Sequence, residues 1–386
     1  MQVDQLEQKK DGATPLEAAK EQRPGSEPAK LSICLYYGHY NWVEKSGIGR
    51  ARVHQFEALT RQQSEAPLDV HFDYRPSDRI VHINTVFLSS WWRAVLARWR
   101  GQLVVYHAHS TSQDFRNSFR FSNLLAPLFG FWLRCCYRQS DLVLTPTDYA
   151  RQLLEGYGLG RPIEVVSNGI DLSAFYPSAE RRQSFRQRYG WSEDETVVLS
   201  VGHYMERKGF TDFLALAKRH PDWHFIWFGY TAAAVLSEPV REALKHKPDN
   251  VLLPGFVRSD ELAEAYAGSD LFLFLTHEET EGIVLLEALA SGVPVLVRDI
   301  EIYRDWVPEG EAVYKATDLA SFDQTMQAML SGVLPSTEEG ALALAESRSL
   351  PVVGERLLSL YQEAMHKQQD RWQKRWRRRP HSASPS

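Results

Sequence analysis

Short apolar segments of strand length alternate along most of this chain with longer segments whose apolar residues recur every three or four positions, the period of a helix. The expected strands are 31–36, 80–83, 103–107, 142–144 and 163–166, followed by 197–201, 224–228, 251–253, 271–275 and 295–297. Strands that alternate with helices favour parallel sheets, because a parallel connection needs a crossover helix.

The alternation runs through the chain twice, with a charged helix expected at 179–189 between the two series. We therefore predict an α/β fold of two doubly wound, Rossmann-like parallel-sheet domains, at 30–172 and 173–349. A chain of 386 residues is long enough for two such cores. Sheets of this kind bind ligands at the carboxyl ends of their strands, so the cleft between the domains is the expected site.

The two ends of the chain differ from this pattern. Residues 1–29 are rich in Glu, Gln, Lys and Pro and predict a disordered extension. Residues 350–366 predict a last helix, and residues 367–386 form a tail in which cations alternate with tryptophans.

Composition narrows the class of protein. The formal net charge is −5, which argues against a general nucleic-acid binder, and no apolar run of about 18 residues predicts a spanning helix. The polar N-terminus lacks the apolar centre of a signal peptide, and three cysteines are too few for a disulfide framework. A cytoplasmic location is expected.

Three stretches combine basic residues with aromatic ones, which favours contact with an anionic membrane surface. The candidate membrane or acceptor residues are Trp91, Trp92, Arg93, Arg116, Arg120, Trp372, Arg375 and Trp376. Solvated charge beside core aromatics explains each stretch equally well. A nucleic-acid interpretation of the tail is weaker, because the rest of the chain is acidic.

The segment around Glu279 and Glu287 carries the clearest chemistry. Gly282 marks a turn, 283–290 is an apolar run of helix formers, and Gly292 ends it. The first N–H groups of that helix can bind a phosphate, and carboxylates on either side can accept hydrogen bonds from sugar hydroxyls. This arrangement predicts a sugar-nucleotide site, whereas an amphipathic helix with solvated glutamates is the alternative.

Two further segments follow expected strands. Gly47 and Gly49 open a helix and allow a ligand to approach the backbone, but Arg52 breaks the third position of a dinucleotide fingerprint. His107 and His109 point to one face of their strand. A metal there would need a third ligand that the sequence does not offer, so no metal is expected.

Together with Gly202–Gly209, the two glutamates resemble the signature of retaining glycosyltransferases of family 4, which have the GT-B fold of two facing Rossmann-like domains. The resemblance implies that Glu279 holds the transferred sugar and Glu287 the ribose of the nucleotide. His109 would lie beside the sugar, and Lys208 would bind the donor diphosphate. His203 departs from the family, since an arginine is usual there, and Arg207 would supply the missing charge.

The donor-binding residues implied by this resemblance can be collected in one set. They are Gly47, Gly49, Gly202, His203, Arg207, Lys208, Glu279, Thr280, Glu281, Gly282, Ile283 and Glu287. The helix at 350–366 would cross back to the first domain. No metal cofactor is implied, since cations and a helix N-terminus stabilise the leaving diphosphate.

Segments 46–50, 109–111, 114–118 and 278–290 look like those of the glycolipid-forming branch of the family. That branch implies a UDP-glucose or UDP-galactose donor and a diacylglycerol or glucosyl-diacylglycerol acceptor. The sequence shows no obvious catalytic base, and the leaving phosphate can take the proton. Two alternatives remain, namely transfer to a soluble or polysaccharide acceptor, and a non-catalytic protein that binds sugar nucleotides or membranes.

Overall fold

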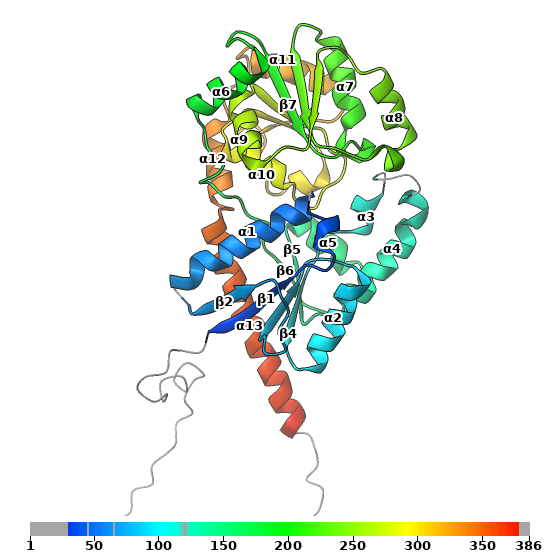
Figure 1. Ribbon diagram of the computed structural model, residues 1–386, viewed down its shortest axis with the longest axis vertical. Helices are drawn as coiled ribbons and strands as arrows, with labels where there is room; N and C mark the ends of the chain where they lie inside the picture. The colour runs from blue at the N-terminus through cyan, green and yellow to red at the C-terminus, as the bar shows by residue number, and fades with distance from the viewer. Residues whose placement is uncertain (1–29, 45, 65, 117, 119–121, 378–386) are drawn as a thin grey trace, which may run out of the picture.

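A computed structural model describes residues 30–44, 46–64, 66–116, 118 and 122–377, and it consists of two lobes, each built on a six-stranded parallel sheet (Figure 1). The predicted fold class, two doubly wound parallel-sheet domains, is confirmed. The predicted extension at 1–29 lies outside the described residues. The predicted boundary at 172/173 stays a prediction, although the two sheets lie on either side of it.

The first lobe contains the sheet β2-β1-β3-β4-β5-β6. Its strands are β1 (Leu31–Tyr36), β2 (Leu68–His71), β3 (Ile80–Ile83), β4 (Leu103–His107), β5 (Leu142–Thr145) and β6 (Ile163–Val165). Its helices are α1 (Gly47–Arg61), α2 (Leu88–Trp99), α3 (Ser112–Phe115), α4 (Ser122–Tyr137) and α5 (Asp148–Glu155). Apolar residues of α1 pack on one face of the sheet, and those of α2 and α4 pack on the other.

The second lobe contains the sheet β12-β11-β10-β7-β8-β9. Its strands are β7 (Val197–Val201), β8 (His224–Phe228), β9 (Val251–Gly255), β10 (Leu271–Phe274), β11 (Val295–Arg298) and β12 (Tyr314–Ala316). Its helices are α6 (Ala179–Tyr189), α7 (Phe210–Arg219), α8 (Glu238–Lys245), α9 (Ser259–Gly268), α10 (Ile283–Ala290), α11 (Leu319–Leu330) and α12 (Glu338–Glu346). Helices α9, α10 and α12 pack on one face, and α7, α8 and α11 pack on the other.

The last helix, α13 (Leu350–Arg377), leaves the second lobe and runs down the first (Figure 1). Leu357 and Tyr361 are buried in the first lobe's core, and the Tyr361 hydroxyl lies 2.6 Å from Nδ1 of His82. The expected end at residue 366 is too early, because the helix continues through the first part of the basic tail. Gln368 is still buried there and donates a 3.3 Å hydrogen bond to the carbonyl of Gln102.

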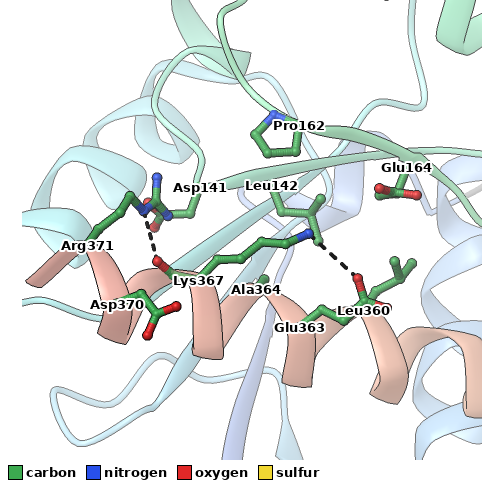
Figure 2. A pocket seen from close by; sticks show the side chains of 10 residues that line it. All are labelled: Asp141, Leu142, Pro162, Glu164, Leu360, Glu363, Ala364, Lys367, Asp370 and Arg371. Carbon is green, nitrogen blue, oxygen red and sulfur yellow. Dashed lines mark hydrogen bonds and ion pairs between the residues drawn. The ribbon is translucent and has the colours of Figure 1, made fainter. Parts of the chain in front are cut away.

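A cavity of about 320 Å³ lies between α13 and the amino ends of β5 and β6 (Figure 2). Two ion pairs join residues that line this cavity. They are Arg371 with Asp141, at 3.4 Å, and Lys367 with Glu363, at 3.6 Å. The cavity lies at the opposite edge of the sheet from the carboxyl ends of the strands. It is therefore separate from the site described next.

Candidate active site

The second lobe's site lies where its strand order reverses, between β7 and β10, the usual ligand position of such sheets. The segments after the two strands leave the sheet side by side. Gly209 makes their contact possible, since its φ is +73° and an added Cβ would lie 2.4 Å from the backbone oxygen of Leu275. This close approach brings Lys208 alongside the loop that carries Glu279.

Lys208 and Glu279 form an ion pair in the cleft. Glu279 is only 8% exposed, and the Thr276 hydroxyl donates a 3.4 Å hydrogen bond to its carboxylate. Burial raises the pKa of Glu279, but the charges of Lys208 and Arg207 outweigh burial and lower it below its ordinary value. The carboxylate is therefore ionised at neutral pH and can accept hydrogen bonds from hydroxyl groups.

Glu287 lies one turn inside α10 and is fully buried. The Tyr266 hydroxyl donates a 3.1 Å hydrogen bond to Oε2, and Nε of Arg50, from the first lobe, lies 3.3 Å from Oε1. Burial raises the pKa of Glu287, which Arg50 and Tyr266 partly offset. Its position across the helix N-terminus from Glu279 is the one that the sequence predicts.

The N-terminus of α10 opens between the two glutamates. Gly282 precedes it with φ +91°, in the left-handed region that favours glycine. Within the part of the chain that the structure describes, the N–H groups of Gly282, Ile283 and Val284 have no hydrogen-bond acceptor. These donors and the positive end of the helix dipole suit a phosphate group.

Glu281, expected among the donor contacts, is used differently. Its buried carboxylate accepts hydrogen bonds from the Ser167 hydroxyl at 2.6 Å and from both the backbone and the side-chain nitrogen of Asn168 at 2.8 Å. Arg348 lies 3.8 Å away. The side chain thus ties the loop before α10 to the segment that joins the lobes, and only the backbone of Glu281 remains for a donor.

Two cationic candidates lie near Lys208. His203 donates from Nδ1 to the carbonyl of Tyr230 at 2.7 Å, and burial lowers its pKa, so it is neutral and does not replace an arginine's charge. Arg207 donates to the Ser118 hydroxyl at 2.9 Å and to the carbonyl of Glu278 at 2.7 Å. Arg207 is therefore the charged residue beside Lys208, and it is held partly by the first lobe.

The first lobe contributes His109 from the end of β4. Its ring stacks on His107 with centroids 4.2 Å apart, and its Nε2 lies 3.0 Å from Oδ1 of Asn84. Burial lowers the pKa of His109 to about 3, so the ring is neutral. A cavity of about 50 Å³ beside it is lined by His109, Ser110, Val86 and other residues of the same edge. His109 can thus act as a neutral hydrogen-bonding group, not as a cation.

The glycine loop at the start of α1 also reaches the cleft. An added Cβ at Gly49 would lie 2.1 Å from the carbonyl oxygen of Glu44, whereas one at Gly47 would meet nothing within 4 Å. The loop's own packing therefore requires a glycine at position 49, whereas the space beside Gly47 is open. Arg50, one residue on, crosses to the second lobe and contacts Glu287 and Ser259.

Other contacts join the lobes around the cleft. The Thr147 hydroxyl donates to the carbonyl of Thr280 at 2.8 Å, and the Tyr149 hydroxyl donates to Glu278 at 2.9 Å. The sequence gives no signal for these pairs, nor for those of Arg50 and Ser118, because they depend on how the lobes meet. For Arg50 alone, its position in the sequence directly after the glycine loop indicated that it lies near the site.

The candidate membrane residues divide into three groups. Trp91 and Arg93 point inward, since Trp91 packs against the first lobe's core and the Arg93 guanidinium lies 3.8 Å from the ring centre of Tyr74. Side chains of one helix turn point in different directions, and these two point toward the protein. Trp91 and Arg93 are therefore unsuited to contact a membrane. Trp92, at 58% exposure, and Arg116 are exposed. Arg120 and the side chains of Trp372, Arg375 and Trp376 lie outside the described residues.

One group of side chains in the described residues could hold a metal ion, namely Cys34, His71 and Asp78. It lies beside β1 and β2, away from the residues of the cleft, and Nε2 of His71 already lies 3.1 Å from Asp78. The expectation that the reaction needs no metal stays a prediction.

Comparison with known proteins agrees with this geometry. Residues 181–336 match the family model "Glycosyl transferases group 1", and residues 71–174 match "Glycosyltransferase Family 4". The chain therefore belongs to the family 4 glycosyltransferases and has their GT-B fold.

Its relatives make the family assignment specific. The chain is 35% identical over 337 residues to the processive diacylglycerol alpha-glucosyltransferase of Acholeplasma laidlawii. The aligned region covers 87% of this chain and 99% of that protein. It is 27% identical over 240 residues to the alpha-galactosylglucosyldiacylglycerol synthase of Streptococcus pneumoniae, covering 60% and 62%. The solved structure of Anabaena HepE in complex with UDP-glucose shares the fold, with a TM-score of 0.69, 15% identity and coverage of 86% and 99%.

Proposed function

We propose that this glycosyltransferase moves glucose or galactose from a UDP-hexose to a diacylglycerol-type membrane lipid, with retention of configuration. The acceptor is diacylglycerol or glucosyl-diacylglycerol, and the reaction takes place at the cytoplasmic surface of the cell membrane. The observation that carries the proposal is the likeness, over 87% of the chain, to a diacylglycerol glucosyltransferase.

The geometry of the second lobe supports a nucleotide-sugar donor. Glu279 would accept hydrogen bonds from the transferred sugar and Glu287 from the ribose, with the diphosphate between them at the N-terminus of α10. As the bond between the anomeric carbon and the phosphate oxygen breaks, negative charge grows on the diphosphate. Lys208, Arg207 and the helix N–H groups stabilise that charge more strongly in the transition state than in the bound donor.

An exposed apolar surface on the first lobe supports a membrane-bound acceptor. Along α4, Leu124, Leu128 and Phe131 are 79%, 67% and 63% exposed, and their spacing places them on one side of the helix. Trp92 and Trp99 of the neighbouring helix α2 are 58% and 82% exposed. Apolar surface of this kind, beside basic residues, suits shallow insertion into a bilayer. Within the described residues, no helix is long and apolar enough to cross a membrane.

The test is transfer of labelled sugar from UDP-glucose and UDP-galactose, in parallel, into solvent-extractable lipid. Vesicles would contain diacylglycerol or glucosyl-diacylglycerol, with and without an anionic phospholipid. We expect label in lipid from one of the donors and more of it on anionic vesicles. Release of UDP with water-soluble sugars, and no label in lipid, would move the acceptor off the membrane.

A further inference from the structure

The ring of His109, just after β4, is held by only one of its two nitrogens. Nε2 lies 3.0 Å from Oδ1 of Asn84, whereas Nδ1 has no hydrogen-bond partner among the described residues. Nδ1 is also not one of the enclosed, unpartnered atoms of that part of the chain, so it reaches accessible space. One nitrogen is therefore tied to the protein, and the other is available to a ligand.

The surroundings of Asn84 determine which of its side-chain atoms faces the ring. Asn84 follows β3 and is buried, and its Nδ2 donates a 3.4 Å hydrogen bond to the carbonyl of His82. A carbonyl oxygen accepts and cannot donate, so the amide nitrogen must face His82, and Oδ1 must face His109. Since Oδ1 is an acceptor, Nε2 of His109 carries the hydrogen of the ring.

The stacked neighbour His107 keeps the plane of the His109 ring. The two ring centroids are 4.2 Å apart, and the angle between the planes is 3°. His107 is itself held, because the Tyr37 hydroxyl donates to Oε1 of Gln55 at 2.9 Å, and Nε2 of Gln55 donates to Nδ1 of His107 at 2.8 Å. A half-turn of the His109 ring would keep this stacking but lose the bond to Asn84. Asn84 therefore selects one of the two orientations that the stacking allows.

We propose that Asn84 is a positioning residue that keeps His109 as a hydrogen-bond acceptor for a hydroxyl group of the transferred sugar. The inference rests on the proposed function, because the resemblance to the family places His109 beside that sugar. A neutral imidazole has one donor and one acceptor nitrogen, so a hydrogen on Nε2 leaves a lone pair on Nδ1. A sugar hydroxyl can donate to this lone pair, as another can to the carboxylate of Glu279 on the opposite lobe.

The groups around the ring favour its neutral form. Burial alone lowers the pKa of His109 to about 3, without a contribution from any carboxyl group of the described residues. The titratable rings that face it are His107 and His82, and burial lowers the pKa of both, so they are neutral as well. The Tyr361 hydroxyl of α13 contacts His82, and burial raises its pKa, so it is also uncharged. His109 should therefore stay neutral throughout the pH range of an activity assay.

Nitrogen-15 NMR of histidine-labelled protein reads the tautomer directly, because protonated and unprotonated ring nitrogens have well-separated shifts. We expect the signals of His109, identified by their loss in His109→Gln, to show a hydrogen on Nε2 and none on Nδ1 at about pH 7. A hydrogen on Nδ1 in the unchanged protein would overturn the proposal.

Asn84→Leu has a similar volume but no acceptor for Nε2. We expect the NMR signals of His109 in this variant to show a mixture of the two tautomers. The kcat for sugar transfer should fall by about tenfold, the size of one lost hydrogen bond in a buried site. The dissociation constant of UDP, which lacks the sugar, should change less than about threefold.

Asn84→Asp separates positioning from support of the fold. A carboxylate has nearly the shape of the amide and still accepts from Nε2, so a bond that only stabilises the fold would be kept. Its negative charge raises the pKa of His109 and favours the doubly protonated ring, in which Nδ1 is a donor. We expect kcat to match that of the unchanged protein at about pH 8.5 and to fall below it by about tenfold as the NMR signals show this second hydrogen arriving.

Gln139→Glu is the matched control. It makes the same change from amide to carboxylate in the first lobe, where the side chain of Gln139 contacts only the carbonyl of Cys135, at 3.5 Å, and no histidine. Its kcat relative to the unchanged protein should not depend on pH. Melting temperatures check that each variant is folded.

The outcomes separate this inference from the proposed function. Full kcat in either Asn84 variant, at a pH where Nδ1 is protonated, would make Asn84 a residue of the fold alone. If neither variant puts a hydrogen on Nδ1, Asn84 does not set the tautomer, and the inference is also wrong. If the unchanged chain labels no lipid, the proposed acceptor is wrong, whereas the NMR measurement still decides on Asn84 because it needs neither donor nor acceptor.

Discussion

Lys208 and Glu279 form an ion pair in the proposed donor site. Both side chains are largely buried, so the removal of one leaves the other without its partner, at a cost of about 3–5 kcal/mol for a buried pair. The proposed role of Glu279 also predicts which property changes on its removal. Because Glu279 is assigned to the sugar and not to the nucleotide, sugar transfer should be lost while UDP binding is largely kept.

We expect Glu279→Ala to lower kcat/KM for transfer by about 100-fold or more, since hydrogen bonds that strengthen in the transition state are lost. UDP lacks the sugar, so its dissociation constant should change less than tenfold. Parallel measurements of transfer and of calorimetric UDP binding check both parts. Full transfer activity in a folded Glu279→Ala protein would show that the site is assigned wrongly.

Arg50 allows a second prediction about a single side chain. Its Nε lies 3.3 Å from the Glu287 oxygen that lacks a hydrogen bond, and this is the oxygen that a ribose hydroxyl would approach. Under the proposed binding of the ribose by Glu287, Arg50 and the ribose hydroxyl would compete for this oxygen. We expect Arg50→Met to tighten UDP binding several-fold, the equivalent of about 1 kcal/mol.

The control for Arg50 is Ser259→Ala, which removes the other hydrogen-bond partner of the guanidinium and leaves Glu287 untouched. It should change UDP binding little. Weaker UDP binding by Arg50→Met would instead mean that Arg50 contacts the nucleotide directly and that the two do not compete.

At the scale of elements, helix α4 makes the clearest prediction. Replacing Leu128 and Phe131 by serine removes two exposed apolar side chains, each able to contribute about 1.5–3 kcal/mol when buried in the bilayer. Vesicle binding should weaken at least tenfold in a sedimentation assay, while the melting temperature changes little because both side chains are mostly exposed. Val333→Ser, an equally exposed position of the second lobe at 74%, should have no effect on binding.

Vesicle binding should also fall with added salt, because salt would screen the proposed attraction between exposed basic residues such as Arg116 and anionic lipid. Binding that is independent of salt would remove the electrostatic part of the membrane proposal and leave the apolar part.

The elements also show what the sequence could and could not predict. Apolar strands such as β4 and β8 follow from their continuous apolar runs, and α10 follows from an apolar run of helix formers between two glycines. The edge strands β2 and β12 do not, since β2 is Leu-Asp-Val-His and β12 has only three residues. Glu279 and Glu287 could be placed on either side of the α10 N-terminus because their spacing is local, and the resemblance of segment 202–209 to the family singles out Lys208. The use of Glu281 as a tie to Asn168 and the contact of Arg50 with Glu287 arise between the lobes, where sequence spacing carries no information.

At the scale of the whole molecule, buried histidines of the first lobe link stability to pH. Burial lowers the pKa of His82 and His109 to about 3 and that of His54 to about 4, from an ordinary value of 6.5. These rings stay neutral in the folded protein, while the unfolded chain takes up protons below pH 6.5. Their contribution to stability is therefore complete above that pH and is lost progressively as the pH falls toward 3–4.

We expect the melting temperature to fall steadily between pH 6.5 and pH 5, with each histidine lowering the free energy of unfolding by on the order of 1 kcal/mol per pH unit. Thermal unfolding at closely spaced pH values measures this slope. His246→Gln, at an exposed position, should not alter the slope. His82→Gln should reduce the slope by the contribution of about one proton taken up on unfolding. A melting temperature that is constant from pH 7 to pH 5 would contradict the expectation.

The path of α13 has a consequence for how the protein is made. Leu350 to Ala364 supply part of the core of a lobe whose strands all come before residue 166. As the chain emerges from the ribosome, the first half is complete long before the helix that covers one face of its sheet. Part of the apolar surface of the N-terminal lobe therefore stays uncovered until the second half has been synthesised. We infer that the order of synthesis and the order of folding differ in this protein, and that its first lobe reaches its final form last.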